Sequence, residues 1–524
     1  MQPKLLPFAV SRAVSIPGLR LLLVVFVVLT ASLDAMAVIT FDVSPVSVPN
    51  AFTGTVELKI MGVSPGAPVR IEKYLDENAN GQIEASEPLL ESFAVTDGLV
   101  PTIGGITNLA VYADHDGATN GQLIVNLDFS PTSEIDRISG QYVFKVSDPS
   151  GSFSPVIQPF TLTAASLPQG ITGVVTDAST GQPISLAQVA LVDLDSSQLV
   201  TSVFVSTNGE FTLYSQPGNY LLLPLRRGYI FTIQADLFSL TNVALQVKTG
   251  QFLTNNVVLR PGNTVISGIL KDAVTGAGIP GVAVYALSSA QDTNGAVSSL
   301  SFTFGLTDGS GNFSVMGQPG TWGFVPLPQQ LARLGYLGLT DFTIVAVTNN
   351  VGTNVTIALP KATALIYGQV KNQAGKPLRG VQVAAHDSNL GFQSFARTDT
   401  NGNYTLGVIA GNWSVEPESS SLNSLGYQGA NTVTFILEDA TATEQSFSVQ
   451  PIPLSVSAAA FLPSGSFQFQ VFGESGNSYQ VQGSSDLKQW APQRSFTIST
   501  SPYLYIDESA KPGLTRFYRV QRQP

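Results

Sequence analysis

A threefold internal repeat is the feature that most constrains how this 524-residue chain can fold. Three segments open alike, with ITGVVTDASTGQPI at 171–184, ISGILKDAVTGAGI at 266–279 and IYGQVKNQAGKPL at 366–378. Each opening is followed by a second signature, in which two glycines stand nine residues apart (209 and 218, 311 and 320, 402 and 411). Duplication of one structural unit explains this spacing. The middle of the chain is therefore expected to fold as three similar domains.

The second signature predicts a tight turn followed by a strand. In Asn208-Gly209, Gly311-Asn312 and Asn401-Gly402, the glycine supplies the positive φ that a short hairpin needs. The residues after each turn alternate between apolar and polar, which is typical of a half-buried strand. Many short strands at this spacing indicate β-sandwiches, and helical periodicity is confined to short candidates such as 329–338. We therefore expect an all-β chain.

The repeated motifs resemble the carboxypeptidase regulatory-like family over roughly residues 168–450. The matching patterns are the openings I-x-G-x-V…G-x-P-I/L…V-x-V and the hairpins N-G-x-F/Y…G-x-Y/W. The resemblance implies a transthyretin-like (prealbumin-like) sandwich, grouped with the carbohydrate-binding-like folds. In that family the module accompanies a peptidase, an outer-membrane barrel or a surface stalk, so the fold implies no function of its own.

The side chains that most enzymes need are scarce. The chain has no Cys and only two His, which excludes thiolate nucleophiles, disulfides, Cys-ligated zinc and most His-based catalysis. His115 and His386 lie in different predicted domains, and neither stands in a nucleophile-elbow or H-E-x-x-H context. A net charge of −11 argues against a nucleic-acid partner. We expect no enzymatic activity and no binding of nucleic acid.

The N-terminus has the three parts of an export signal. Lys4, Arg12 and Arg20 precede an apolar run at 21–30, and Ala35-Met36-Ala37 supplies small residues for cleavage. The run is shorter than the roughly 20 residues that span a bilayer, although an uncleaved anchor remains the alternative. Because no second long apolar segment follows, we expect a mature chain without a transmembrane segment. The predicted location is extracellular, at the cell surface or in the periplasm.

The predicted architecture is a string of about five β-sandwich domains after the signal peptide. The C-terminal pattern G-x-x-Y-x-V-Q-x-S-x-D-L-x-x-W…D…FYRV resembles a terminal fibronectin-III-like module of exported bacterial proteins, with Tyr479, Trp490, Phe517 and Tyr518 as expected core aromatics. Expected strands of the first domain include 68–75, 108–114, 121–129 and 140–148. The predicted boundaries are 1–37 for the signal peptide, 38–166 for an immunoglobulin-like sandwich, 167–261, 262–361 and 362–451 for repeats 1, 2 and 3, and 452–524 for the fibronectin-III-like module.

The first domain contains the sharpest site motif, DENANGQIEASE at 76–87. It resembles the calcium loop of an EF-hand, with a glycine at position 6 for the sharp turn and a carboxylate at position 12. The preceding segment alternates like a strand and Pro88 follows the loop, so a lone Ca²⁺ loop within a sandwich is expected rather than a paired EF-hand. The alternative is an Asn/Gly-rich hairpin tip with incidental acids. The candidate ligands are Asp76, Asn78, Asn80, Gln82 through its backbone carbonyl, Glu84 and Glu87.

Two weaker candidate sites accompany this loop. Asp114 and Asp116 could form a second cation site, although a solvated turn is favoured there. Tyr220, Trp322 and Trp413 hold equivalent positions in the three repeats and could stack against sugar rings. The alternative is that each ring lies in the core of its sandwich, and a sugar site could also lie on the loop at 288–302.

Two functions compete on this sequence. The first is a non-enzymatic scaffold or adhesion protein of the bacterial envelope or extracellular space, stabilised by calcium. The second is binding of polysaccharide through the carbohydrate-binding-like repeats. Polysaccharide or envelope proteins are the expected partners, and the role of an accessory subunit to a separate enzyme stays open. Exposed rings at Trp322 and Trp413 would favour the second function, and buried rings would favour the first.

Overall fold

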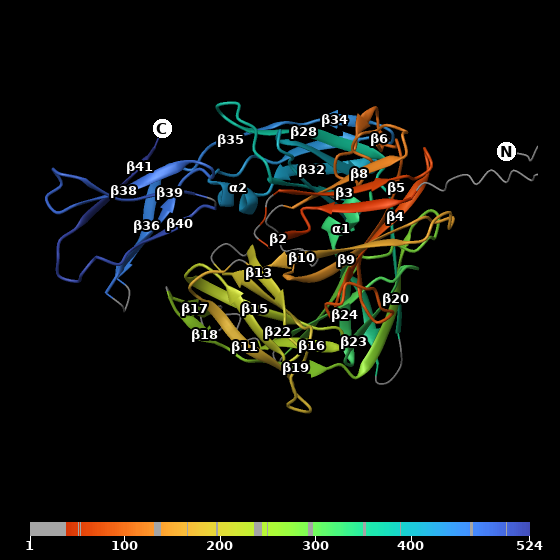
Figure 1. The fold of residues 1–524 in the computed structure, drawn as a ribbon, viewed down its shortest axis with the longest axis horizontal. Coiled ribbons are helices and arrows are strands. Elements are labelled where there is room, and N and C mark those ends of the chain that lie inside the picture. Colours follow the sequence, from red (N-terminus) through yellow and green to blue (C-terminus); the bar gives the residue numbers. More distant parts are fainter. Residues whose placement is uncertain are drawn as a thin grey trace, which may run out of the picture. The chain divides into compact units, whose positions relative to one another are not determined.

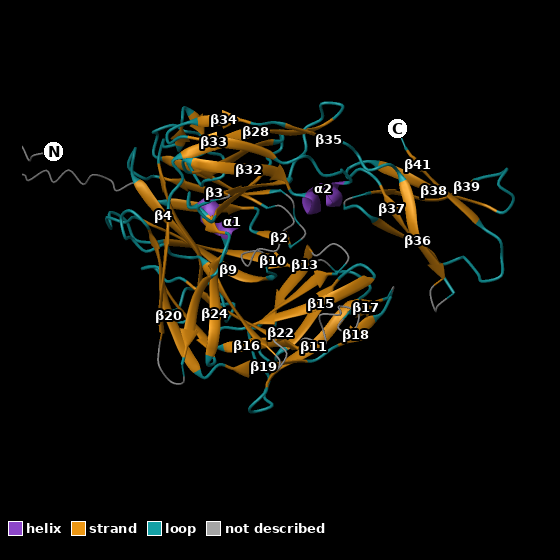
Figure 2. Ribbon diagram, turned by 180° about the vertical axis from the view of Figure 1, so that it is seen from behind, coloured by secondary structure: helices purple, strands orange, loops and turns teal. Residues whose placement is uncertain are grey.

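The computed structural model describes residues 38–523, except 51, 53, 130–137, 165, 195–197, 235–243, 249, 292–296, 349–352, 388, 462–464 and 499. Strands dominate these residues, and the two helices among them are short (Figure 2), which confirms the all-β prediction. The predicted signal peptide lies outside the described residues. Within the described part of the chain, no helix has both the length and the apolar character needed to cross a membrane.

The first domain is a two-sheet sandwich. Its strands alternate between buried and exposed residues, as in Thr55–Met61, so each sheet offers one apolar face. The three-stranded sheet has the order β1 (Thr40–Ser44), β3 (Thr55–Met61), β8 (Gln122–Asp128). The five-stranded sheet has the order β2 (Ser47–Pro49), β10 (Val156–Thr163), β9 (Gly140–Ser147), β4 (Pro68–Leu75), β5 (Leu89–Thr96), and β6 (Thr102–Ile103) pairs with β7 (Ile106–Thr107).

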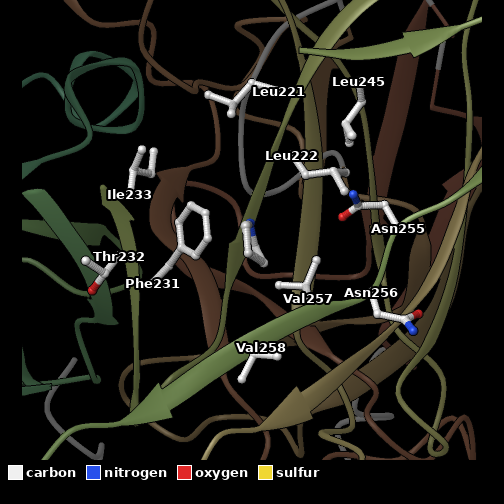
Figure 3. A pocket seen from close by; sticks show the side chains of 11 residues that line it. Leu221, Leu222, Phe231, Thr232, Ile233, Leu245, Asn255, Asn256, Val257 and Val258 are labelled. Atoms are coloured by element: carbon white, nitrogen blue, oxygen red, sulfur yellow. The ribbon is translucent and has the colours of Figure 1, made fainter. Parts of the chain in front are cut away.

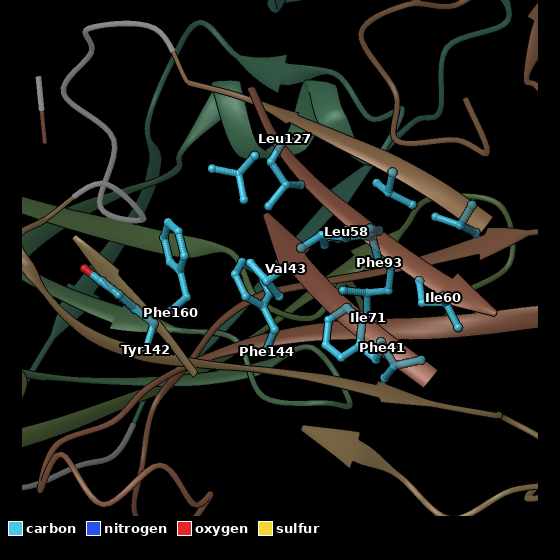
Figure 4. Packing of buried hydrophobic residues seen from close by; sticks show 14 of the residues in the cluster. Phe41, Val43, Leu58, Ile60, Ile71, Phe93, Leu127, Tyr142, Phe144 and Phe160 are labelled. Atoms are coloured by element: carbon cyan, nitrogen blue, oxygen red, sulfur yellow. The ribbon is translucent and has the colours of Figure 1, made fainter. Parts of the chain in front are cut away.

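The facing sheets of this domain enclose one apolar core (Figure 4). Leu58 from β3 and Ile71 from β4 are fully buried there. Lys73 also lies inside, with its Nζ 4.4 Å from the centre of the Tyr142 ring. Burying such a cation against an aromatic face offsets part of its desolvation.

The expected strand at 108–114 is wrong, because this segment joins neither sheet. The Asn108 Oδ1 atom accepts the Ala110 N–H at 3.2 Å, a local bond that competes with strand pairing.

The three repeats have the same strand pairing. Figure 1 colours their strands along the sequence, from yellow in repeat 1 through green to blue in repeat 3. In each, the opening strand pairs antiparallel with the strand after the Gly turn and parallel with the last strand or strands. A second sheet covers it. Repeat 1 combines β14 (Glu210–Tyr214), β11 (Gly170–Asp177), β18 (Phe252–Thr254) and β19 (Val257–Pro261) with β13 (Gln198–Phe204), β12 (Gln188–Asp193), β15 (Gly218–Leu225) and β17 (Leu245–Val247).

Repeats 2 and 3 follow this pattern with their own strands. Repeat 2 combines β23 (Asn312–Gly317), β20 (Thr264–Asp272) and β27 (Thr353–Leu359) with β22 (Val297–Leu306), β21 (Ala283–Gln291), β24 (Gly320–Pro326) and β26 (Thr343–Val347). Repeat 3 combines β31 (Asn403–Val408), β28 (Ala364–Asn372), β34 (Ala442–Glu444) and β35 (Phe447–Val449) with β30 (Phe392–Arg397), β29 (Gln382–Asp387), β32 (Gly411–Pro417) and β33 (Val433–Leu437).

Neighbouring repeats also share strand pairs. The expected helix within 329–338 is confirmed as α1 (Pro328–Arg333), and repeat 3 has α2 (Ser419–Leu425) at the matching place. In repeat 1 a short turn leads from β15 to β16 (Tyr229–Gln234) without a helix, and β16 pairs with β19 and with β22 of repeat 2. The short strand β25 (Gly338–Leu339) pairs with β30 of repeat 3. Sheets therefore continue across the predicted domain boundaries.

The C-terminal module is also a two-sheet structure. Tyr479 is buried and Tyr518 packs against the core, as expected. Phe517 is 36% exposed, which corrects its placement in the core: it neighbours the inward Tyr518 on one strand, so it faces the other way. Trp490 is half-buried and lies 4.4 Å from the Arg519 guanidinium. The sheets are β36 (Ser455–Phe461), β37 (Phe467–Phe472), β40 (Tyr503–Asp507) and β39 (Ala491–Thr497), β38 (Ser478–Ser484), β41 (Phe517–Arg522).

Candidate functional site

The loop at 76–87 connects the antiparallel neighbours β4 and β5. Asp76 directly follows β4, and its N–H donates to the Gln141 carbonyl at 3.0 Å. At the other end the Leu75 N–H donates to the Pro88 carbonyl at 3.1 Å, so the strands are still joined where the loop begins and ends. The sequence thus places the loop on a rigid β-hairpin rather than between two helices.

The first and last acids of the loop are held by its own backbone. The Asp76 carboxylate accepts the Asn80 N–H at 3.1 Å and the Gly81 N–H at 2.8 Å. The Glu87 carboxylate accepts the Glu77 N–H at 2.9 Å and the Glu84 N–H at 3.0 Å. Asp76 and Glu87 are each only 7% exposed. The loop therefore folds around its two terminal acids.

The middle of the loop is built from amide side chains. The Asn78 Oδ1 atom accepts the Asn80 N–H at 3.0 Å, and the Asn80 Oδ1 atom accepts the Gln82 N–H at 2.7 Å. The Asn80 Nδ2 atom donates to Glu84 Oε1 at 2.7 Å. Gly81 adopts φ 73°, which glycine tolerates best, and this agrees with the expected sharp turn. The six predicted ligand residues thus belong to one hydrogen-bonded loop, Gln82 through its N–H.

An oxygen-only donor set fits a hard cation such as Ca²⁺. Glu84 Oε2 is buried without a hydrogen-bond partner, and a cation would compensate this unsatisfied oxygen. The Asn80 hydrogen bond holds the pKa of Glu84 below its usual value, whereas burial raises the pKa of Glu87. Among the described residues, no three His, Cys, Asp or Glu side chains are already gathered as a metal cluster. Calcium would therefore need the amide and carbonyl oxygens of the loop in addition to its acids.

The second acidic stretch is a structural turn in the described fold. Asp114 is fully buried, and its carboxylate accepts the Gly98 N–H at 2.8 Å and the Ile124 N–H at 3.1 Å. Asp116 is exposed and accepts the Ala118 N–H at 2.8 Å. The turn is therefore confirmed for Asp116, but Asp114 is not solvated as expected. Backbone N–H groups satisfy Asp114, and a backbone N–H together with the side-chain amides of Asn120 and Gln122 satisfies Asp116.

The three aromatic positions of the repeats are in the cores, which corrects their assignment as possible glycan contacts. Tyr220 is 2% exposed, and Trp322 and Trp413 are 0% exposed. Each ring donates to the carbonyl four residues earlier, at 2.7 Å for Tyr220, 2.8 Å for Trp322 and 2.9 Å for Trp413. A ring enclosed between two sheets offers no face to a sugar. These bonds instead anchor each ring to the turn before its strand.

A tyrosine–acid pair in the repeats was not foreseen from the sequence. The Tyr229 hydroxyl donates to Asp177 Oδ2 at 2.9 Å in repeat 1, and the Tyr336 hydroxyl donates to Asp272 Oδ2 at 3.0 Å in repeat 2. Asp177 and Asp272 are both the seventh residue of the repeated opening, so aligning the repeats identifies the position. The contact itself spans 52 or 64 residues and has no local signal.

A cavity of 240 Å³ lies within repeat 1 (Figure 3). Its lining contains no ionisable side chain. The Thr232 hydroxyl is hydrogen-bonded to Ser301 Oγ at 2.9 Å, and Asn256 Oδ1 accepts the Val174 N–H at 3.0 Å. The lining thus offers apolar contacts without an acid–base pair. Its residues are Leu221, Leu222, Pro224, Phe231, Thr232, Ile233, Leu245, Asn255, Asn256, Val257 and Val258.

Solved structures similar to this chain include pilins and the Bacillus anthracis TIE protein. The Bacillus anthracis TIE protein is 14% identical over 80% of this chain and 75% of its own, with a TM-score of 0.17. A streptococcal ancillary pilin is 15% identical over 54% of this chain and 99% of its own, with a TM-score of 0.19. The major pilin subunit BcpA of Bacillus cereus is 10% identical over the same shares, with a TM-score of 0.16. Similarity this low supports no conclusion about function.

The family comparison is more specific but covers one repeat. No curated protein matches the chain. The model of the carboxypeptidase regulatory-like domain matches residues 365–450, which span β28 to β35. The resemblance noted in the sequence is therefore confirmed for the third copy. Residues 365–450 form one carboxypeptidase regulatory-like domain.

Proposed function

We propose that this chain is a non-enzymatic, exported scaffold or adhesion protein of the bacterial envelope or extracellular space, with a first domain stabilised by calcium. The observation that supports the scaffold most directly is the continuity of the sheets, because β16 pairs with β22 and β25 pairs with β30. Backbone hydrogen bonds across a boundary resist separation of neighbouring domains. The burial of Trp322 and Trp413 favours this function over polysaccharide binding at those rings.

Repeats 1 and 2 belong to the same domain type as repeat 3 in this proposal. All three have the same strand pairing and the same ring-to-carbonyl hydrogen bond at Tyr220, Trp322 and Trp413. The resemblance to the family assigns no catalytic role to this module, which agrees with a structural function. The expected partners are other components of the envelope.

Calcium would be held by the loop between β4 and β5. Asp76, Asn78, Asn80, Glu84 and Glu87 would provide side-chain oxygens, and Gln82 its backbone carbonyl. The ion would supply the positive charge that the buried acids of the loop lack. Sites of this kind in extracellular modules bind at roughly 10⁻⁴–10⁻³ M. The orphaned Glu84 Oε2 atom is the feature that most favours the ion over an empty hairpin tip.

Two measurements test the two parts of this proposal separately. Calorimetric titration of the mature chain with CaCl₂ is expected to show one weak site. Asp76→Asn combined with Glu87→Gln should abolish it, because these changes remove both terminal charges while keeping side-chain size. Asp116→Asn is the matched control and should leave the titration unchanged. Titrations that are equal for the parent and the double variant would contradict the site.

The scaffold function is tested by retention on isolated cell envelopes. Beads coated with the mature chain should bind to the isolated envelopes. The polymers of the envelope should remain chemically intact on prolonged incubation with the protein. Turnover of any envelope polymer, absent from a heat-denatured sample, would contradict the non-enzymatic assignment. Competition by soluble polysaccharide would instead support the alternative function at a site other than the buried rings.

A further inference from the structure

Repeat 3 departs from repeats 1 and 2 at one position of the shared opening. The seventh residue is Asp177 in repeat 1, Asp272 in repeat 2 and Asn372 in repeat 3. In all three copies its Oδ1 atom accepts the N–H two residues later, at 2.7, 2.8 and 3.0 Å. The side chain therefore holds the start of the turn in the same way in all three copies, although the turn is one residue shorter in repeat 3. The second polar atom of the side chain differs as well. That atom is a carboxylate oxygen in repeats 1 and 2 and an amide nitrogen in repeat 3.

This difference changes the hydrogen bond of the partner tyrosine. Tyr229 and Tyr336 donate their single O–H proton to the acid of their own repeat. Tyr427, the equivalent residue in repeat 3, instead accepts from Asn372 Nδ2 at 3.4 Å. A phenol has one proton to donate. Because an amide nitrogen cannot accept it, the proton of Tyr427 remains available for another acceptor.

The acceptor comes from the C-terminal module. The Tyr427 hydroxyl donates to Glu474 Oε2 at 2.8 Å, and the other oxygen of Glu474 accepts from Arg522 at 2.9 Å. Tyr427 is 2% exposed and Asn372 is 9% exposed, whereas the side chains of Glu474 and Arg522 are 15% and 56% exposed, so the bond is partly buried. Charge-assisted bonds of this kind are about twice as strong as neutral ones.

Backbone contacts surround this bond at the end of α2. The Ser475 N–H donates to the Leu425 carbonyl at 2.9 Å, and the Ser501 N–H donates to the Ser424 carbonyl at 2.8 Å. Gly426 has φ 83°, and a Cβ atom there would stand 2.1 Å from the Gly473 carbonyl oxygen. The C-terminal module thus approaches the helix end as closely as backbone atoms allow.

We propose that Asn372 is a specificity determinant that reserves Tyr427 for the carboxylate of Glu474 and so docks the C-terminal module on repeat 3. An Asp at position 372 would place a second carboxylate at the same hydroxyl. Two acids would then compete for one proton in a partly buried site, and like charges there disfavour each other. Repeats 1 and 2 retain the Asp because their tyrosines are satisfied within the repeat. This residue therefore distinguishes the repeats whose tyrosine bonds to an acid of the same repeat from the repeat whose tyrosine bonds to an acid of the following module.

A spin-label distance measurement on the mature chain tests this docking. The chain has no Cys, so Thr400→Cys in repeat 3 and Lys488→Cys in the C-terminal module, both exposed positions, provide unique label sites. The parent is expected to give one narrow distance distribution. Asn372→Asp should broaden it, with an increase of about tenfold in the undocked fraction, equivalent to ~1.4 kcal/mol. Adding Glu474→Gln to Asn372→Asp should restore the narrow distribution, since the glutamine side chain is neutral and its amide N–H can donate to the Tyr427 oxygen while the new carboxylate accepts the hydroxyl proton.

Asn401→Asp is the charge-matched control, because it adds the same charge at the exposed tip of a hairpin in repeat 3. It should leave the distance distribution unchanged. An unaltered distribution in Asn372→Asp would overturn the proposal. Broadening that Glu474→Gln does not reverse would also overturn it, because the added charge would then act through the fold of repeat 3 rather than through Glu474.

Discussion

Single acids fix the turns of the repeats through bonds to backbone N–H groups. Asp272 accepts the N–H groups of Val274 and Thr275 at 2.8 Å each, as well as the Tyr336 hydroxyl. These bonds, led by the Thr275 N–H, lower the pKa of Asp272 to about 2. An unfolded Asp titrates near pH 3.9. Asp272 therefore stabilises repeat 2 above about pH 4, and this contribution is lost as the pH falls toward 2.

Replacing Asp272 by Asn tests this pH dependence. The variant cannot titrate, so we expect repeat 2 to be less stable than the parent at pH 7 and the difference to shrink as the pH falls from 4 to 2. Brief pepsin digestion at matched acidic pH values, with cleavage mapped by mass spectrometry, reports the opening of β20. Repeat 3, which has Asn372, is the internal control. A parent-to-variant difference that stays constant down to pH 2 would show that Asp272 does not contribute through its charge.

The glycine of the opening motif is required by close packing. A Cβ atom at Gly173 would lie 2.0 Å from the Asn255 carbonyl oxygen, and at Gly368 1.7 Å from that of Gln445. At Gly268 it would lie 2.3 Å from the Phe313 ring. The motif is thus a packing signature rather than a site for a ligand.

We expect Gly268→Ala to destabilise repeat 2 by about 1–3 kcal/mol, the usual cost of overpacking. Gly309 is the matched control in the same repeat, because nothing lies within 4 Å of a Cβ atom there. Denaturant-dependent hydrogen exchange of β20 would measure both variants. Equal stability of Gly268→Ala and Gly309→Ala would refute the packing argument.

At the scale of elements, alternation predicted strands well where each strand has one apolar face. The segments 68–75, 121–129 and 140–148 became β4, β8 and β9. Alternation failed to predict the structure of 108–114, where the Asn108 side chain accepts a backbone N–H of its own segment and no strand forms. The helix α2 was not foreseen, because SSSLNSL has one fully buried apolar residue, Leu422, and no clear periodicity. Its presence follows from the repeat, since it matches α1 in position.

The sequence predicted which residues form the candidate loop but not which hydrogen bonds they make. The spacing from Asp76 to Glu87 indicated which side chains converge. The unsatisfied oxygen of Glu84 could not be inferred, because it depends on how Asn80 and Glu87 orient the neighbouring groups. The burial of Trp322 and Trp413 could not be inferred for a similar reason. The alternation of a strand does not show whether a second sheet covers the face that carries its aromatic residue.

At the scale of the whole molecule, shared strands should couple the repeats. Strand β16 lies between β19 and β22, so repeat 1 cannot lose it without exposing an edge of repeat 2. We expect β12 and β21 to lose hydrogen-exchange protection together as urea increases. Thr232→Pro removes a backbone N–H within β16 and should separate the two transitions.

Thr232→Val is the control for this coupling, because it keeps the backbone N–H and removes only the hydroxyl that contacts Ser301. It should leave the transitions together. Separate unfolding of repeats 1 and 2 in the parent chain would contradict the coupling.

Differential scanning calorimetry of residues 38–524, in excess CaCl₂ and then in chelator, tests whether calcium stabilises the first domain. Hydrogen exchange of β4 and β5 assigns the transition of the first domain. We expect the melting temperature of this transition to rise by roughly 5 °C when free calcium is about ten times the dissociation constant. Asp76→Asn with Glu87→Gln should eliminate the rise. The same melting curve with calcium and with chelator would contradict a calcium-stabilised first domain.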